Sequence, residues 1–384
     1  MSDKTKNLSE ESLAAHKKLR GKISVVSKDS VSDKNKLSLY YTPGVGAVSS
    51  FVAENPELAR DYTWLNNTVA VISDGSAVLG LGNLGPVGAL PVMEGKAMLF
   101  KQFAGIDSIP IVLDVHSADE IVSAVKAIAP SFGAINLEDI AAPICFEVEE
   151  RLKSELNIPI MHDDQHGTAI VVLAGLINAM KVVNKSLDDC KLVVSGVGAA
   201  GVAIMKLLKL FSPGLTIVAC DSKGVINSNR NDLNSTKQKL LDDGIISSNS
   251  DGKLSNAINN ADIFVGVSQP NVLTIDMVKS MNSDAVIFAL ANPNPEIMPD
   301  DAKNAGAAVV ATGRSDFPNQ VNNALAFPGI FRGALDNRVN KITDDHKIAA
   351  AEAIAGFIEN PSANEIIPSI FIDGLSKAVA SVIR

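Results

Sequence analysis

The feature that most constrains the fold is a glycine motif between a predicted strand and a predicted helix. The pattern G-x-G-x-x-G spans residues 196–201, after a β-branched run over residues 191–195 and within an apolar stretch that continues over residues 199–210. The next predicted strand, residues 215–220, ends at Asp221, about twenty residues beyond the last glycine. These are the parts of a dinucleotide site: a tight turn, bare backbone, a helix N-terminus and a carboxylate. The sequence therefore predicts a Rossmann-type domain, in which the residues expected to contact the nucleotide are Gly196, Gly198, Ala199, Ala200, Gly201 and Asp221.

Asp221 also bears on which nucleotide binds. A carboxylate at this place accepts both ribose hydroxyls of NAD and repels the 2′-phosphate of NADP. Lys223, two residues further on, offsets part of that repulsion. The sequence favours NAD and keeps NADP as an alternative cofactor.

A second G-x-G-x-x-G match, over residues 80–85, is not expected to bind a nucleotide. Pro86 and Pro91 follow it where a pyrophosphate would need a helix, and proline disfavours helix interiors. We therefore expect residues 73–96 to form a glycine-lined loop that lets a small substrate approach the backbone and that ends on a helix carrying Lys96.

Strands and helices alternate on both sides of the fingerprint, which predicts parallel sheets covered by helices on both faces. The predicted strands cover residues 69–73, 109–115, 133–137, 158–161, 191–195, 215–220, 263–267, 286–289 and 309–311. The predicted helices cover residues 94–103, 117–128, 142–156, 168–181 and 199–210.

The length of 384 residues fits two domains. We place an N-terminal α/β domain for substrate and metal at residues 1–157 and the Rossmann domain at residues 158–384. Residues 227–253 are polar and are expected to form a solvated excursion at the edge of the sheet. Residues 344–384 are expected to be helical and to pack back across the first domain.

Acidic side chains follow two of the predicted strands. Glu138 and Asp139 come after one strand, and Asp163 and Asp164 come after the next strand in the chain. Because the carboxyl ends of parallel strands face the ligand crevice, these four carboxylates would repel one another unless they shared a cation. Oxygen ligands favour Mg²⁺ or Mn²⁺ over Zn²⁺. Capping of the helices that follow is the alternative explanation.

Charge and composition argue against two classes of partner. The chain has 34 Lys+Arg against 43 Asp+Glu, a net charge of −9, and has no basic run that could follow a nucleic-acid backbone. The longest apolar stretch, residues 169–180, is too short for a membrane span, and residues 1–11 are too polar for a signal peptide. Three widely spaced cysteines fit a reducing compartment, so we expect a cytoplasmic protein.

Seven motifs in order resemble those of the malic enzyme family, from about residue 16 to about residue 340. They are Tyr-Thr-Pro-Gly-Val at 41–45, the glycine-rich loop that ends in Val-Met-Glu-Gly-Lys at 92–96, Asn-Leu-Glu-Asp at 136–139, His-Asp-Asp-Gln-His-Gly-Thr at 162–168, the fingerprint at 196–201, Ala-Asn-Pro-Asn-Pro-Glu at 291–296 and Asn-Asn-Ala-Leu-Ala-Phe-Pro-Gly at 322–329. The length is similar to that of the short prokaryotic form of this family.

The resemblance implies a role for each matching residue. The implied metal ligands are Glu138, Asp139 and Asp164, the general base is Lys96, which would pair with Asp163, and the general acid is Tyr41. Asn292 and Asn323 would hold the substrate's carboxylate and hydroxyl, and Asn292 would also contact the nucleotide. Without the resemblance, Tyr41 is explained as an amphipathic residue before the turn-forming Pro43.

The implied reaction is the oxidative decarboxylation of (S)-malate to pyruvate and CO₂, with reduction of NAD(P)⁺ and a divalent metal, in a homodimer that also decarboxylates oxaloacetate. One departure stands out, because Ala77 occupies a position where the longer eukaryotic enzymes carry an arginine. How the C1 carboxylate is neutralised is therefore left open between the metal and the loop amides. The state of Lys96 is open too, since burial beside a metal lowers a lysine's pKa and pairing with Asp163 raises it.

Three alternatives share much of this pattern. A malolactic-type enzyme would retain NAD and release lactate. A metal-free dehydrogenase of the shikimate or amino-acid type has a similar two-domain layout. A nucleotide sensor would bind NAD without turnover. Nucleotide preference, preferred metal, effectors and oligomeric state are not fixed by the residues themselves.

Overall fold

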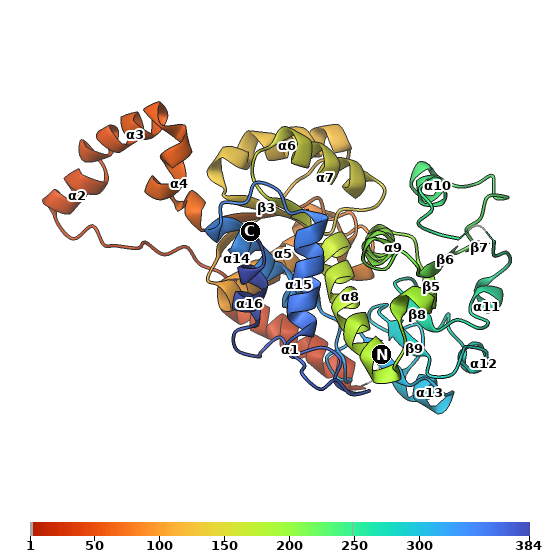
Figure 1. The fold of residues 1–384 in the computed structure, drawn as a ribbon. Coiled ribbons are helices and arrows are strands. Elements are labelled where there is room, and N and C mark those ends of the chain that lie inside the picture. Colours follow the sequence, from red (N-terminus) through yellow and green to blue (C-terminus); the bar gives the residue numbers. More distant parts are fainter. Residues whose placement is uncertain (1–2, 248) are drawn as a thin grey trace.

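Two β-sheets organise the chain in the computed structural model, which describes residues 3–247 and 249–384 (Figure 1). A four-stranded sheet has the order β2-β1-β3-β4, and a six-stranded sheet has the order β10-β9-β8-β5-β6-β7. The described strand pairs are parallel except for the edge pair β6 and β7. The predicted α/β class with a Rossmann-type sheet is confirmed.

The first sheet consists of β1 (Thr68–Ser73), β2 (Asp107–Val112), β3 (Ala134–Leu137) and β4 (Ile160–His162). Successive strand residues point to opposite faces. Val69 and Val71 of β1 pack into the core that includes helix α5 (Gly85–Ala104). Ala70 and Ile72 pack into the core formed with α6 (Ala118–Ile128) and α7 (Ile144–Glu155).

The second sheet consists of β5 (Lys191–Ser195), β6 (Thr216–Asp221), β7 (Gly224–Val225), β8 (Ile263–Gly266), β9 (Val286–Ala289) and β10 (Val309–Thr312). Leu192 and Val194 of β5 pack toward α9 (Ala199–Phe211). Val193, on the opposite face, belongs to the core of the short helices α11 (Leu254–Ala257), α12 (Ile275–Lys279) and α13 (Pro299–Asn304).

The long helix α8 (Asp163–Val183) joins the two sheets. It begins at Asp163 and not near residue 168 as the sequence suggested, because the acidic residues of its first turn favour a helix N-terminus. By length and composition α8 could cross a membrane, but 67% of its most apolar window is buried inside the fold. Such burial is typical of a core helix.

Helix α5 also begins earlier than predicted, at Gly85, so the expectation that prolines prevent a helix here was wrong. Pro86 lies in the first turn, where its missing N–H breaks no bond within the helix. Pro91 is inside the helix, where its buried neighbours Ala89 and Met93 hold the chain against the sheet. The glycine-lined loop is therefore shorter than expected and ends at Gly85.

The C-terminal helices pack back on the first part of the chain, as predicted. On α14 (Phe327–Asp336), Phe327 contacts Phe100 of α5 at 4.7 Å between ring centroids. α16 (Leu375–Ser381) packs so closely on α14 that a Cβ at Gly333 would lie 2.4 Å from the Ala380 carbonyl oxygen. α15 (Asp344–Ala355) packs along α8, whereas residues 356–374, which were expected to be helical, form turns and bends.

The polar segment after β6 has more structure than the sequence predicted. It contains α10 (Ser235–Asp242), and both Leu240 and Ile246 reach the main core. Most of the other described residues of this segment are exposed at the edge of the second sheet, as expected for an excursion (Figure 1).

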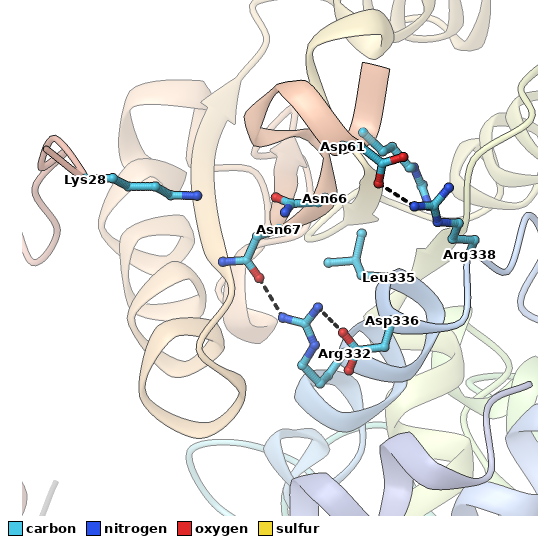
Figure 2. A pocket seen from close by; sticks show the side chains of 9 residues that line it. Lys28, Asp61, Asn66, Asn67, Arg332, Leu335, Asp336 and Arg338 are labelled. Atoms are coloured by element: carbon cyan, nitrogen blue, oxygen red, sulfur yellow. Dashed lines mark hydrogen bonds and ion pairs between the residues drawn. The ribbon is translucent and has the colours of Figure 1, made fainter. Parts of the chain in front are cut away.

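The N-terminal residues make an arm. Helices α2 (Lys34–Tyr40), α3 (Gly44–Glu54) and α4 (Ala59–Tyr62) stand apart from the body, while α1 (Asp3–Leu19) lies along it (Figure 1). Among residues whose burial is described, none before Thr68 is buried. Figure 2 shows the junction of arm and body, a polar cavity of about 380 Å³ where Asp61 pairs with Arg338. Beside it, Arg332 donates to the Asn67 side chain at 2.6 Å.

Candidate active site

Three carboxylates meet where β3 and β4 end side by side. Glu138 and Asp139 follow β3, and Asp164 lies in the first turn of α8, directly after β4. One oxygen from each carboxylate lies within 4.8 Å of the others. The Asp139 backbone N–H donates to Asp164 Oδ2 at 2.7 Å, which fixes the two segments against each other.

These carboxylates are costly to ionise together. Burial, followed by the charges of Asp164 and Glu138, raises the pKa of Asp139 to about 8. Burial also raises the pKa of Asp164 to about 6. Asp139 Oδ2 is buried and makes no hydrogen bond within the described chain. A hard divalent cation such as Mg²⁺ or Mn²⁺ fits this oxygen donor set and would balance its charge.

Lys96 projects from α5 beside the cluster and is 7% exposed. Its Nζ lies 2.6 Å from Asp163 Oδ2, 2.8 Å from Glu138 Oε1 and 4.3 Å from the centroid of the Phe327 ring. Burial lowers the pKa of Lys96, but the charges of Asp163 and Glu138 outweigh burial and raise that pKa overall. Without a cation on the carboxylates, the lysine is therefore an ammonium.

Asp163 is completely buried and is held from two further sides. Asn323, in the turn before α14, donates to Asp163 Oδ2 at 2.5 Å. A Cβ at Gly167 would lie 1.9 Å from Asp163 Oδ1, so only glycine leaves room for this carboxylate. Burial raises the pKa of Asp163 to about 6 against the opposing charge of Lys96. The structure thus brings Lys96, Asp163 and Asn323 together.

The glycine-lined loop lies directly on the carboxylate cluster. The Ala77 N–H donates to the Asp139 carbonyl oxygen at 3.0 Å, and the Leu79 N–H donates to Asp139 Oδ1 at 3.4 Å. A Cβ at Gly80 would lie 3.5 Å from the carbonyl oxygen of Asn292, which follows β9 of the other sheet. The carboxyl ends of both sheets therefore meet at this loop.

Tyr41 is not part of this group. It follows α2 in the arm and is 67% exposed. Helix α2, which Tyr41 follows, stands apart from α5, the helix that carries Lys96 (Figure 1). The structure therefore does not bring the residue predicted as the general acid to the residue predicted as the base.

The fingerprint between β5 and α9 fits a dinucleotide. Gly196 has φ +109°, and a Cβ there would lie 2.6 Å from the Val267 carbonyl oxygen. A Cβ at Gly201 would lie 2.0 Å from the Gly196 carbonyl oxygen, so this glycine lets strand and helix pack closely. Gly198 faces open space directly before Ala199, the first residue of α9. Bare backbone thus borders the place where a pyrophosphate binds in this motif.

Asp221 at the end of β6 is already engaged by two cations that sequence reasoning missed. Arg230 donates to both of its oxygens at 2.8 and 3.1 Å, and Lys237 Nζ lies 2.5 Å away. Burial opposes ionisation, but these hydrogen bonds lower the pKa of Asp221 to about 2. The ammonium of Lys223, expected to offset the charge of Asp221, pairs with Asp232 at 2.6 Å instead. Cationic residues in the polar excursion after β6 were the signal available in the sequence.

Two further partners of the site could not be read from the sequence. Asn136 in β3 donates to Glu138 Oε2 at 2.9 Å and orients that carboxylate. Glu149 of α7 accepts from the His162 backbone N–H at 3.0 Å and contacts His166 Nε2 at 2.8 Å. The side chain of His166 is thus engaged by a carboxylate of α7.

Comparison with known proteins identifies relatives over almost the whole chain. Residues 20–153 match the family model described as malic enzyme, N-terminal domain, and residues 165–384 match malic enzyme, NAD binding domain. A bifunctional malic/malolactic enzyme of Bacillus subtilis is 53% identical over 98% of this chain and 92% of its own length. An NAD-dependent malic enzyme of Geobacillus stearothermophilus is 52% identical over 95% of this chain and 76% of its own length.

An NADP-dependent relative and a solved structure also match this chain. An NADP-dependent malic enzyme of Escherichia coli is 47% identical over 92% of this chain, which spans 46% of that protein. The crystal structure of an NAD-dependent malic enzyme from Thermotoga maritima superposes with a TM-score of 0.93 at 49% identity, over 97% of this chain and 98% of that one.

Proposed function

The chain belongs to the malic enzyme family, and from that premise we propose that it oxidises and decarboxylates (S)-malate to pyruvate and CO₂ with NAD⁺, using a divalent metal. Its close homologues are NAD- and NADP-dependent malic enzymes, which are oxidoreductases. The observation that carries the proposal is the placement of Lys96 between Asp163 and Glu138, beside the three-carboxylate cluster.

Different residues of the chain would bind the metal, bind the nucleotide and accept the proton. Glu138, Asp139 and Asp164 would hold the metal, and the fingerprint glycines would hold the nucleotide. When bound, a divalent ion supplies a Lewis acid for the substrate oxygens, and its charge offsets the carboxylates that raise the Lys96 pKa. Lys96 then accepts the proton of the C2 hydroxyl while Asp163 holds the amine in place.

Asn323 and the loop amides would orient the substrate. Asn323 reaches Asp163 and so stands beside the position of the reacting hydroxyl. The side chain of Ala77 has no charge to offer the C1 carboxylate of the substrate. The backbone N–H groups of Ala77 and Leu79 already donate to Asp139, so the loop amides lie close to the proposed metal site. Loss of CO₂ leaves an enol of pyruvate, which needs a proton at C3, and a tyrosine hydroxyl is a suitable donor.

We assign that tyrosine to a second copy of the chain. Tyr41 lies in the exposed arm, and the arm also exposes Leu39, Tyr40 and Val48 to solvent. Apolar side chains on a segment without a core of its own are typical of an interface between subunits. A homodimer in which each arm covers the partner's site would bring Tyr41 next to Lys96.

The test is turnover of (S)-malate with NAD⁺ or NADP⁺, with and without Mn²⁺, followed by the reduced nucleotide and by pyruvate. Lys96→Met should lower kcat by about 10² to 10⁴-fold, as loss of a general base does, while NAD⁺ binding persists. Lys101→Met, on the same helix but exposed, is the control. Turnover by Lys96→Met at the wild-type rate would remove Lys96 from the mechanism.

A malolactic reaction is the second candidate, because the Bacillus subtilis relative is named as a bifunctional malic/malolactic enzyme. The same site would then return the hydride to pyruvate before release. Lactate formed from malate without net release of NADH would identify this reaction. Pyruvate and NADH in equal amounts would exclude it.

A further inference from the structure

A second cavity lies behind α9, away from the fingerprint glycines. It has a volume of about 550 Å³ and is enclosed by α7, α8, α9, α10 and α15. From α9 it is lined by residues between Val202 and Leu210, and not by the N-terminal residues that border the nucleotide site. Cavities of this size hold small organic ligands.

One wall of the cavity is apolar. Val202, Ala203, Leu207 and Leu210 of α9 face Phe146 of α7 across it. Burial of a ligand's apolar part against this wall removes apolar surface from water and so stabilises a complex. The cavity therefore suits a ligand with an apolar body rather than an inorganic ion.

The walls carry charge of both signs, from Lys153, Lys206, Lys239 and Lys347 against the carboxylates Glu149, Glu150 and Asp344, so one positive charge is left over. Lys153 pairs with Glu149 at 2.6 Å, and Lys347 pairs with Asp344 at 2.7 Å. Lys206 and Lys239 also line the cavity, and neither makes an ion pair within the described part of the chain. These two ammonium groups are exposed and available to an anion.

A buried amide adds an independent observation. Gln165 lines the cavity from the first turn of α8 and is 4% exposed. Its Nε2 is buried and has no hydrogen-bond partner in the described chain. An unsatisfied buried donor destabilises the fold, and an acceptor group on a ligand would satisfy it.

We infer that this cavity is a binding site for a small organic anion with an apolar body. The anionic group lies near Lys206 and Lys239 and accepts from Gln165, and the apolar body packs against α9. The ligand would contact the same helical turn that carries Asp163 and Asp164, but on the other side of α8. The chemistry fits either a carboxylate or a phosphate ester.

Two fluorescent probes separate those sources: 1-naphthoate for a carboxylate and 1-naphthyl phosphate for a phosphate ester. Fluorescence anisotropy of each probe is measured with the full chain, with excess NAD⁺ present to fill the nucleotide site. We expect at least one anion to bind more tightly than neutral 1-naphthalenemethanol by roughly tenfold or more. Because no malate is turned over, this result is independent of the proposed reaction.

Variants then locate the probe. The double variant Lys206→Gln/Lys239→Gln should weaken anion binding at least about tenfold, since exposed lysines can be replaced without loss of folding. Gln165→Leu should weaken it in the same direction. The double variant Lys279→Gln/Lys341→Gln removes the same charge from exposed positions outside the cavity and should bind as the wild type does. Equal binding of the neutral probe, or unchanged anion binding by the Lys206/Lys239 variant, would overturn the inference.

Discussion

In this site the charged neighbours of a side chain determine its protonation state, and the protonation state determines its chemical role. Lys96 could not be assigned as amine or ammonium from the sequence, because burial and pairing act in opposite directions on its pKa. Two carboxylates at 2.6 and 2.8 Å settle this in favour of the ammonium when no cation is bound. Asp221 behaves similarly, since its charge is balanced by Arg230 and Lys237 before any nucleotide arrives.

The balanced charge of Asp221 predicts use of both nucleotides. Lys237 can turn from Asp221 toward a 2′-phosphate, so Lys237→Gln should lower kcat/KM for NADP⁺ about tenfold and change that for NAD⁺ much less. Lys279→Gln, an equal change of charge on α12, is the control. Equal losses with both nucleotides would show that Lys237 does not distinguish between them.

His166, which is partly buried, predicts one contribution to the pH dependence of stability. Burial, which outweighs the nearby Glu149 charge, lowers the pKa of His166 to about 4, and Lys153 and Lys347 act in the same direction. The unfolded value is about 6.5, so between these values only the unfolded chain binds the proton. The contribution of His166 to stability should therefore be fully present above about pH 6.5 and should be lost as the pH drops toward about 4. Urea unfolding of the wild type and of His166→Gln at pH 7 and pH 5 isolates this contribution, because the carboxylates with raised pKa values act equally in both proteins, and the free energy of unfolding of the wild type should change less favourably than that of His166→Gln between pH 7 and pH 5.

The positions of several site residues could be predicted from the sequence. Glu138, Asp139 and Asp164 were expected to converge because residues that follow neighbouring parallel strands meet at one edge, and they do. Arg230 and Glu149 were missed, because a long-range side-chain partner leaves no periodic pattern in a sequence. The cationic residues after β6 indicated that a partner for Asp221 was available, but not which residue it is.

At the scale of elements, the largest differences from prediction concern where helices begin. α5 and α8 both start several residues before the apolar pattern does, at Gly85 and Asp163. The first turn of α5 is the end of the glycine-lined loop, and the first turn of α8 contains the acidic residues. Both turns are helical but show no hydrophobic periodicity, so the sequence pattern does not reveal them. Strand centres were predicted well, because β-branched runs buried on both faces are distinctive.

The arm gives a prediction about exchange between subunits. Tyr41→Phe and Lys96→Met should each be inactive alone. If Tyr41 acts in the partner's site, a mixed dimer of the two variants contains one site with both native residues. Unfolding and refolding the two variants together should then restore about a quarter of wild-type activity, since about half of the dimers are mixed and each has one working site.

The control for this experiment is refolding of each variant with itself, which should restore nothing. A mixture as inactive as its components would show that Tyr41 does not act across the dimer. Size-exclusion chromatography of Phe51→Glu in α3, where Phe51 packs on Tyr62 at 5.0 Å, tests whether the arm holds the dimer together.

For the whole molecule, the decisive feature is that two sheets present their carboxyl ends to each other across the glycine-lined loop. The two-sheet architecture followed from the alternating pattern, and its class is confirmed. The contact between the loop at Gly80 and the segment at Asn292 could not be predicted, because it depends on how two separate sheets are oriented.

Global stability should respond to metal. Carboxylates whose pKa is raised to about 8 at Asp139 and about 6 at Asp164 destabilise the metal-free fold near neutral pH. Free Mn²⁺ at a hundred times its Kd should add about 2.7 kcal/mol of stability over protein in EDTA. Thermal unfolding measures this as a higher Tm, and Asp139→Asn should abolish most of the rise. Equal Tm values in EDTA and Mn²⁺ would contradict a metal site here.

The helix that starts with Asp163 continues as one of the most buried elements of the fold, with Ala169 through Ala174 almost fully inaccessible. The acidic first turn and the core residues therefore belong to one helix, and the packing of the core fixes the position of the acidic turn. A change that relieves crowding deep in the interior will displace the acidic turn at its head. Variants designed for new substrates should accordingly change the glycine-lined loop and keep the sequence of α8.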